Sequence, residues 1–303
     1  MCTSLAFKTN DFYFCRNMDL DYHFGERVVI TPRGYTLPLK HQSPIQVKHA
    51  IIGMATVASS YPLYAEGVNE KGLCISALNF EGNAQYTDAV DGKINLAPYE
   101  IIPYILAQCE SVLEAKGLLD RLQITSTPFS EKIGTSPLHW HIADAEQSIT
   151  LESTSDGVKI YENPIGALTN NPPFDFHLKN IATYSHLSPT PPKEGDISLG
   201  LSMLGLPGDF SSPSRLVRLA ILSKLVSRPS TEEESVKMAY NLMLSVAPLK
   251  GVALTKNGRE HYTIYTCIIN ATKGVYYYTT PEMIGMRALS LHAHASDKTL
   301  FCT

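Results

Sequence analysis

The sequence predicts an α+β domain in which layers of strands and helices pack on one another. Strand-like and helix-like segments follow each other in blocks and do not alternate as in a repeating βαβ fold. The chain of 303 residues contains no internal repeat, low-complexity tract or linker that would separate two halves. A chain of this length buries roughly 75% of its unfolded surface. We therefore expect one domain with a core that needs no disulfides.

The first block of the chain reads as strands. Apolar and aromatic runs joined by a polar tetrapeptide predict an N-terminal hairpin, and further apolar runs predict buried strands after it. The expected strands are Ser4 to Phe7, Phe12 to Met18, Val28 to Pro32, Ala50 to Val57 and Leu73 to Leu78, the last preceded by a turn from Gly67 to Gly72.

Helices and strands then alternate in blocks. Pro98 suits the first turn of a helix to Cys109, in which Pro103 predicts a kink or break. Helix-start signals, two of them capping boxes, predict three more helices. These run from Ser111 to Leu122, from Ser212-Pro213 to Ser227, and from the box Ser230 to Glu233 on to Val246. Strands are expected at 138–144, 148–152, 158–161, 262–269 and 275–280, and a long exposed loop from Leu187 to Asp196.

Charge and composition exclude several classes of partner. The net charge is −4, from 25 basic and 29 acidic residues without a basic cluster, so we expect no nucleic acid partner. The N-terminus lacks the basic and apolar regions of a secretory signal, and no run approaches the ~18 apolar residues of a membrane span. We therefore expect a cytoplasmic protein without membrane insertion. The six cysteines form neither CxxC pairs nor zinc-type spacings.

Cys2 is the first candidate for chemistry, although a cysteine at position 2 is usually accidental. A small residue there generally permits removal of Met1, which would leave a thiol and a free α-amine on one residue. The amine, with an ordinary pKa of ~7.7–8.0, could serve as the base for the thiol. Such a nucleophile needs a cation to favour the thiolate, a carboxylate to orient the amine, and donors for the oxyanion.

Arg16 and Asp19 could supply the cation and the carboxylate. They are three residues apart on a predicted strand, so strict alternation places them on opposite faces. A bend near Met18 would turn Asp19 inward. The alternative, which spacing alone favours, is a pair of exposed charges on a strand edge.

Asn79 and Asn170 are candidates for the oxyanion donors. Asn79 closes an apolar strand, and Asn170 lies in a Leu-Thr-Asn-Asn-Pro segment, where asparagine is usually a turn former. Arg215, near the start of a predicted helix, is either a site residue or a solvated arginine. The histidine pairs 139/141 and 292/294 each lack a third metal ligand, which favours a structural role.

Together these residues resemble the choloylglycine hydrolase family, which holds bile salt hydrolases and penicillin V acylases. The matching segments follow the family's order along nearly the whole chain: Met1–Thr3, Phe14–Asp19, Tyr61–Tyr64, Asn69–Leu73, Leu138–Trp140, Leu168–Pro172, Gly205–Phe210 and Tyr276–Tyr278. The resemblance implies an N-terminal-nucleophile αββα fold over residues 2–303, with two antiparallel sheets between helix layers and Met1 removed.

The resemblance also assigns roles to the candidate residues. It implies Cys2 as nucleophile and α-amine base, with Arg16 and Asp19 beside it. It implies Asn79 and Asn170 at the oxyanion site and Arg215 as a second arginine of the site. It further implies no metal or cofactor, and a homotetramer assembled partly through the segment from Leu187 to Gly205.

The substrate implied by the resemblance is a glycine- or taurine-conjugated bile salt, cleaved at its amide. Asn79 favours this, because many penicillin V acylases carry tyrosine at the matching position. The positions that match the family's pocket are mostly apolar, as a steroid face requires, although a phenoxyacetyl group would also fit and some could be core residues. They are Met18, Phe24, Ala58, Ala65, Phe129 and Ile133.

Other functions stay open at this point. Penicillin V or an N-acyl homoserine lactone is an alternative substrate, and a steroid-binding protein that keeps Met1 is the alternative outside the enzymes. The sequence departs from the family at Cys15, where relatives often carry glycine or alanine. A thiol there could crowd the site or make it sensitive to oxidation. The segment from Leu199 to Leu204 replaces a more glycine-rich loop, so the preference between glycine and taurine conjugates is not predicted.

Overall fold

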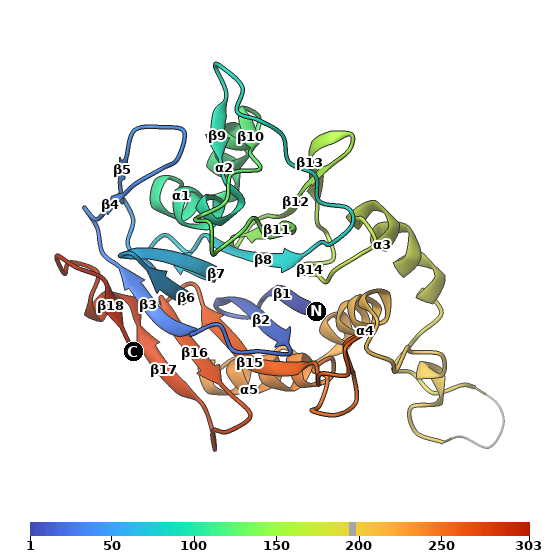
Figure 1. Ribbon diagram of the computed structural model, residues 1–303. Coiled ribbons are helices and arrows are strands. Elements are labelled where there is room, and N and C mark those ends of the chain that lie inside the picture. The colour runs from blue at the N-terminus through green and yellow to red at the C-terminus, as the bar shows by residue number, and fades with distance from the viewer. Residues whose placement is uncertain (194–197) are drawn as a thin grey trace.

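Two antiparallel sheets lie face to face in the computed structural model of the chain, with helices on the outer face of each (Figure 1). The structure describes residues 1–193 and 198–303. The six-stranded sheet contains, in spatial order, β14 (Ala167–Leu168), β1 (Cys2–Lys8), β2 (Phe12–Leu20), β15 (Tyr262–Asn270), β16 (Val275–Thr279) and β17 (Arg287–Ser290).

The eight-stranded sheet takes most of its strands from the first half of the chain. Its spatial order is β13 (Gly157–Glu162), β12 (Ser148–Thr154), β11 (Leu138–Ala143), β8 (Cys74–Asn79), β7 (Tyr61–Asn69), β6 (Ile51–Ala58), β3 (Arg27–Thr31) and β18 (Phe301–Cys302). Two small strand pairs lie outside it: β4 (Thr36–Leu37) with β5 (Ile45–Gln46), and β9 (Ile94–Leu96) with β10 (Leu122–Ile124).

Helices cover both outer faces. α1 (Ile101–Gln108) and α2 (Val112–Leu119) pack on the eight-stranded sheet, and α4 (Ser212–Leu225) and α5 (Glu232–Leu244) pack on the six-stranded sheet. α3 (Phe174–Asn180) leads into the segment that projects from the body in Figure 1. Short 3-10 helices span Pro98–Glu100, Ile181–Tyr184, Leu201–Met203 and Leu291–Ala293.

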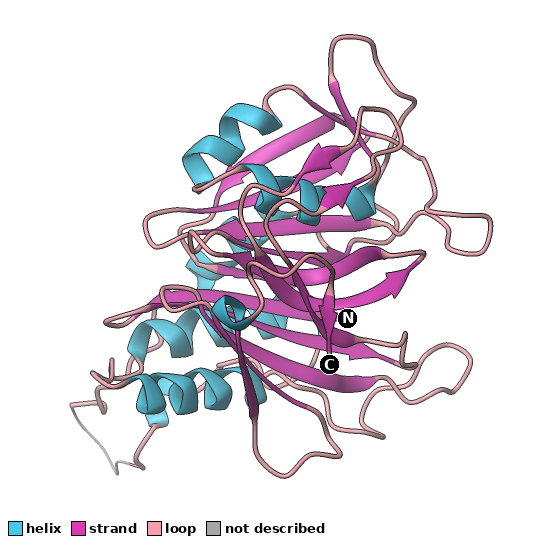
Figure 2. Ribbon diagram, turned by 90° about the vertical axis from the view of Figure 1, so that its left-hand side faces the viewer, coloured by secondary structure: helices cyan, strands magenta, loops and turns pink. Residues whose placement is uncertain are grey.

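Strand alternation divides the core into three apolar layers, and Figure 2 shows the stacked sheets from the side. Phe14 on β2 packs between the sheets, whereas its neighbour Cys15 packs against the helix layer of α4 and α5. Trp140 on β11 packs in the third layer, under α1 and α2. The arrangement is an αββα sandwich, and the predicted fold class is confirmed. No helix of residues 1–193 and 198–303 is long and apolar enough to cross a membrane.

Several predicted helix boundaries are wrong by small amounts. The helix expected from Pro98 divides at Glu100 into a 3-10 turn and α1, so that Pro103 falls in the first turn of α1, where no intrahelical N–H bond is lost. α2 ends at Leu119, and Leu122 already belongs to β10. The N-cap position of α4 is Ser211, whose side chain makes no capping hydrogen bond, and the Ser212 hydroxyl accepts from the Asn170 N–H.

The cap of α5 is Thr231, one residue beyond the predicted Ser230. The Thr231 hydroxyl oxygen accepts a hydrogen bond from the Glu234 backbone N–H at 3.3 Å. It also donates to the Glu234 carboxylate at 2.8 Å. Three consecutive glutamates follow Thr231, so the capping pattern fits equally well one residue earlier in sequence alone.

β7 is absent from the predicted strands. The chain stays extended from Tyr61 to Asn69, and the turn expected from Gly67 begins only after Asn69, with Gly72 at φ 86°. Pro62 pairs with Val57 of β6, at a point where β7 has no bonded neighbour on its other side. A proline is tolerated in such an edge position because its missing N–H would face no partner strand.

Of the loop expected from Leu187 to Asp196, residues 194–196 lie outside the described residues.

Replacing Thr231 by alanine should lower the free energy of unfolding by about 1 kcal/mol, because the first turn of α5 loses its cap. Urea unfolding followed by circular dichroism would measure the change. Ser230→Ala is the matched control, and an equal loss in both variants would contradict the assignment of the cap.

Candidate active site

Cys2 opens β1 and pairs with Met18 on β2. Its side chain is 3% exposed and lies in the layer between the two sheets. Arg16 Nη2 approaches Cys2 Sγ at 3.4 Å. Burial raises the pKa of this thiol, but the positive charges of Arg16 and of the N-terminal amine outweigh it and hold the pKa below its ordinary value. The site therefore favours a thiolate at Cys2.

Arg16 is held by acceptors from the opposite sheet. Its Nη1 donates to Glu66 Oε2 at 2.8 Å and to the carbonyl oxygen of Ala65, and its Nη2 donates to the carbonyl oxygen of Ala77 at 2.6 Å. These bonds leave the guanidinium in one orientation, with Nη2 directed at Cys2. The expectation of an exposed charge on a strand edge is wrong, because Arg16 is 2% exposed.

Glu66 is a residue of this site that sequence reasoning missed. It is fully buried on β7 and, besides Arg16, accepts hydrogen bonds from the hydroxyls of Tyr265 at 2.8 Å and Tyr276 at 2.6 Å. A single carboxylate in the middle of an apolar strand was the available signal, because acidic side chains are almost never fully buried without a partner.

Asp19 faces away from Arg16, as strict alternation predicts. β2 continues to Leu20, and its pairing with β15 is irregular between Met18 and Asp19. Asp19 is fully buried, so the expectation of an exposed carboxylate is wrong. Its Oδ1 accepts from Thr263 at 2.7 Å, and its Oδ2 lies 4.0 Å from Arg215 Nη1 without a hydrogen bond to any described residue.

The chain's N-terminal end lies beside Asp19. The Met1 ammonium donates to the carbonyl oxygen of Asp19 and lies near His261 Nε2, each at 2.9 Å. Burial lowers the pKa of this amine. Burial, together with the ammonium, also lowers the pKa of His261, which favours a neutral ring that accepts the hydrogen bond.

Asn170 connects Cys2 to the remaining candidates. Its Oδ1 accepts from the backbone N–H of Cys2 and from Arg215 Nη2, both at 2.8 Å, and its Nδ2 donates to the carbonyl oxygen of Asn79 at 2.7 Å. Arg215 Nη1 donates to the carbonyl oxygen of Cys2 at 2.6 Å. Arg215 is fully buried, so the solvated arginine is excluded, whereas the Asn79 side chain at the end of β8 is exposed.

The structure does not gather the six predicted pocket residues around one cavity. Phe129 and Ile133 line a cavity of about 150 Å³ next to Ala77, whose carbonyl oxygen binds Arg16. Three others pack with the layer between the sheets, where Cys2 lies: Met18, Phe24 and Ala65. Ala58, at the end of β6, belongs to neither group.

Cys15 does not crowd the site. Its side chain lies in the layer between the six-stranded sheet and the helices α4 and α5, on the face of β2 opposite Arg16. Burial raises the pKa of the Cys15 thiol well above its ordinary value, which disfavours the thiolate form. The expected crowding is therefore contradicted by the packing, and the sensitivity to oxidation stays a prediction.

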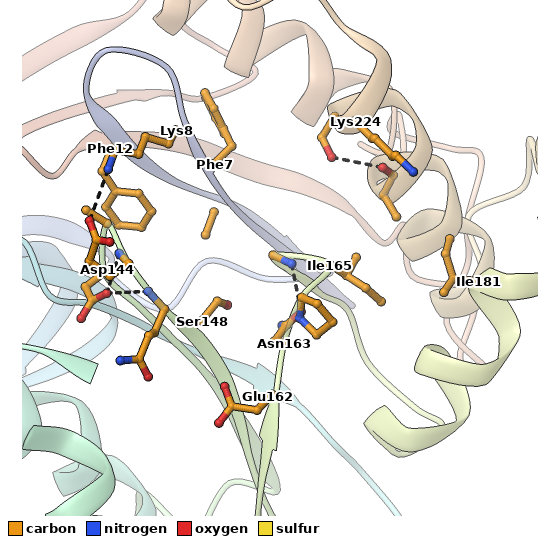
Figure 3. Close-up of a pocket in the computed structure, with 18 of the residues that line it drawn as sticks. Phe7, Lys8, Phe12, Asp144, Ser148, Glu162, Asn163, Ile165, Ile181 and Lys224 are labelled. Atoms are coloured by element: carbon orange, nitrogen blue, oxygen red, sulfur yellow. Dashed lines mark hydrogen bonds and ion pairs between the residues drawn. The ribbon is translucent and has the colours of Figure 1, made fainter. Parts of the chain in front are cut away.

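A larger cavity, of about 760 Å³, lies elsewhere (Figure 3). It lies at the far end of β1, and its lining residues include Phe7, Lys8, Glu162 and Lys224. Lys8 lies six residue steps along the extended strand from Cys2, a distance of roughly 20 Å. None of the predicted site residues lines this cavity.

Over residues 1–193 and 198–303, no three His, Cys, Asp or Glu side chains are grouped to hold a metal ion. His141 lies 2.8 Å from each of the hydroxyls of Ser4 and Ser148, and burial lowers its pKa to about 3. His141 is thus a neutral core residue.

Comparisons with known proteins agree with this geometry. Residues 2–303 match the family model of linear amide C–N hydrolases, choloylglycine hydrolase family. A bile salt hydrolase/transferase from Lactiplantibacillus plantarum is 40% identical, with 99% of this chain and 95% of that protein covered. A conjugated bile acid hydrolase from Lactobacillus gasseri is 37% identical, with 91% and 92% covered.

Solved structures show the same fold. A C2A mutant of the conjugated bile acid hydrolase from Clostridium perfringens superposes with a TM-score of 0.91 at 32% identity, covering 100% of this chain and 96% of that one. Penicillin V acylase from Agrobacterium tumefaciens gives a TM-score of 0.80 at 18% identity, covering 99% and 90%, which shows the fold alone. The chain belongs to the choloylglycine hydrolase family and is an amidohydrolase of linear, non-peptide C–N bonds.

Proposed function

We propose that the chain loses Met1 and hydrolyses the amide bond of glycine- or taurine-conjugated bile salts, with Cys2 as the nucleophile. The observation that carries the proposal is the buried Cys2 thiol at 3.4 Å from the Arg16 guanidinium, one residue from the chain's end. The relatives at 40% and 37% identity are bile salt and conjugated bile acid hydrolases by name. Asn79, at the end of β8, supports the same substrate class.

The proposed reaction has two steps. The Cys2 thiolate attacks the amide carbonyl carbon, a thioester forms, and the C–N bond breaks as the α-amine of Cys2 passes a proton to the departing glycine or taurine. Water then attacks the thioester, the amine takes up its proton, and the thiolate is released. The burial that lowers the pKa of the Met1 amine would act in the same direction on a Cys2 amine, which suits a base near neutral pH.

The proposed partners of the free amine are Asn170 and Asp19. Asn170 Oδ1 already accepts from the Cys2 nitrogen at 2.8 Å, and Asp19 Oδ2, unbonded to any residue that the structure describes, lies at the same end of β1. The amide groups of Asn79 and Asn170 would donate to the oxyanion. Arg215 would hold the Cys2 carbonyl oxygen and thus the position of the first residue.

Acyl transfer is a second candidate for the same thioester. The relative from Lactiplantibacillus plantarum is a hydrolase/transferase by name. An amine that reached the thioester before water would form a new amide by the reverse of the first step, with the same atoms in play. Adding a free amino acid to the assay and analysing the products by mass spectrometry distinguishes transfer from hydrolysis.

We also propose assembly into a homotetramer through the described residues between Leu187 and Gly205, which lie between α3 and α4 in the chain. Two leucines among them are unusually exposed: 94% for Leu199 and 77% for Leu204. Clustered exposed apolar side chains on a protein surface indicate a contact with another chain. The cytoplasmic location expected from the N-terminal sequence stays a prediction.

Purified protein should release the amine from glycocholate and taurocholate faster than from penicillin V at equal concentration. Cys2→Ala should show only the background rate with all three, because it removes the only nucleophile of the reaction. Cys15→Ala is the matched control, since Cys15 packs on the other face of β2. Faster release from penicillin V would overturn the substrate, and activity in Cys2→Ala would overturn the mechanism.

Arg16→Gln should raise the pH midpoint at which iodoacetamide alkylates Cys2. In wild type the Arg16 guanidinium acts to lower the thiol pKa, so thiolate and alkylation appear at lower pH than they would without it. Loss of the guanidinium removes this stabilisation, and the midpoint moves upward. Mass spectrometry of the N-terminal peptide measures it, with Arg218→Gln as a control arginine on α4. An unchanged midpoint would show that Arg16 does not act on the thiol.

Leu199→Asp combined with Leu204→Asp should convert the tetramer into smaller species, because each charge would be buried in the contact. Light scattering after gel filtration measures the mass. Leu113→Asp, at a position 68% exposed on α2, should leave the mass unchanged. A wild-type monomer would refute the proposed assembly.

A further inference from the structure

His139 on β11 is fully buried, and each of its ring nitrogens faces an acceptor. Nε2 lies 2.9 Å from the carbonyl oxygen of Thr169, and Nδ1 lies 3.1 Å from Glu152 Oε1 on β12. The ring stacks on Phe80, with 4.3 Å between centroids and 6° between planes. The ring is therefore fixed in place and joins the eight-stranded sheet to the segment that carries Asn170.

The partners determine where the protons are. A carbonyl oxygen can only accept, so Nε2 carries a proton and donates it to Thr169. The two Glu152 oxygens accept from the Phe174 backbone N–H at 3.1 and 3.3 Å, as an ionised carboxylate can. Since a carboxylate also only accepts, Nδ1 carries a proton as well. The distances fit an imidazolium that is paired with an ionised Glu152.

The residue that follows Thr169 is Asn170, and its backbone is held in a similar manner. The Asn170 carbonyl oxygen lies 3.0 Å from His177 Nε2 on α3, and the Asn170 backbone N–H donates to the Ser212 hydroxyl at 2.8 Å. The Thr169 hydroxyl also reaches Ser212. The backbone of the two residues is thus bound by β11, α3 and α4 together.

We propose that His139, as an imidazolium paired with Glu152, is a positioning residue that holds the Thr169–Asn170 segment and so aims the Asn170 side chain at Cys2. The inference rests on the proposed role of Asn170 in amide hydrolysis. A charged donor forms a hydrogen bond roughly twice as strong as a neutral donor does. A strong bond from His139 to the Thr169 carbonyl oxygen suits a contact on which the geometry of the site depends.

The charges around His139 are consistent with this pairing. Glu152 on β12 is the carboxylate in contact with it. His141 lies two residues along β11. His177 on α3 and Arg215 on α4 lie on the far side of the Thr169–Asn170 segment. Burial lowers the pKa values of His141 and His177 and so favours their neutral forms. The only direct ionic partner in the described part of the chain is thus Glu152.

The protonation is tested by NMR of full-length protein labelled with ¹⁵N-histidine at neutral pH. Two N–H signals should belong to the His139 ring, and both should vanish in His139→Gln. In Glu152→Gln the new amide can donate to Nδ1, so one ring N–H signal should remain and kcat should stay close to wild type. A wild-type ring with a single N–H would overturn the imidazolium.

The positioning is tested with His139→Phe, which keeps the stacking on Phe80 but offers no N–H group. We expect kcat for glycocholate to fall roughly 10- to 100-fold, below the 10²–10³ cost of removing an oxyanion donor itself, with little change in KM. His141→Gln, a matched buried histidine outside this contact, should retain kcat. Unchanged kcat in His139→Phe would overturn the positioning role.

An activity-free measurement separates this inference from the proposed function. The side-chain NH₂ signals of Asn170, assigned by their loss in Asn170→Ala, should shift in folded His139→Phe and stay in place in His141→Gln. If His139→Phe does not fold, Glu152→Leu, which removes the partner of Nδ1, should show the same shift. Wild type that cleaves no bile salt would refute the proposed function, while unshifted Asn170 signals would refute the role of His139.

Discussion

The ion pair between Arg16 and Glu66 is the interaction on which the site depends. Two charges buried between apolar sheets carry a desolvation cost of several kcal/mol each, and only good geometry with further hydrogen bonds offsets it. Two carbonyl oxygens on the Arg16 side and two tyrosine hydroxyls on the Glu66 side supply these bonds. Because the pair bridges β2 and β7, the spacing of the two sheets and the direction of the guanidinium are set together, and with them the charge beside Cys2.

Hydrogen bonds from the first residues of the chain then tie the site to the helix layer. β1 pairs along its whole length with β2, so Cys2 lies opposite Met18 and next to Arg16. Arg215 on α4 binds the Cys2 carbonyl oxygen and Asn170 together. The nucleophile is thus held by a sheet, a helix and a loop that are far apart in sequence, which suits a reaction whose rate depends on fixed geometry.

Sequence patterns predicted those features that depend on residues close together in the chain. Apolar runs located most of the long strands, capping boxes located α2 and α5, and the motif order led to the αββα fold. Patterns of this kind could not identify β7, because its Pro62 and Gly67 resemble turn residues until β6 is known to lie beside them. Nor could they reveal Glu66 or the pairing of His139 with Glu152, since both depend on which strands of a sheet become neighbours.

The position of Cys2 at a strand end explains how residues on opposite faces of β2 can serve one nucleophile. Within a strand, a side chain can reach only the groups on its own face, which is why alternation argued against a joint role for Arg16 and Asp19. The thiol of Cys2 lies on the face of Arg16, but its nitrogen lies at the end of the strand, where Asn170 binds it. The carbonyl oxygen of Asp19 binds the amine one residue earlier, at Met1. A residue at a strand end can therefore place its thiol on one face of the strand and its amine at the strand end. The charged groups that act on the thiol then stay apart from those that act on the amine, so they do not form ion pairs with each other.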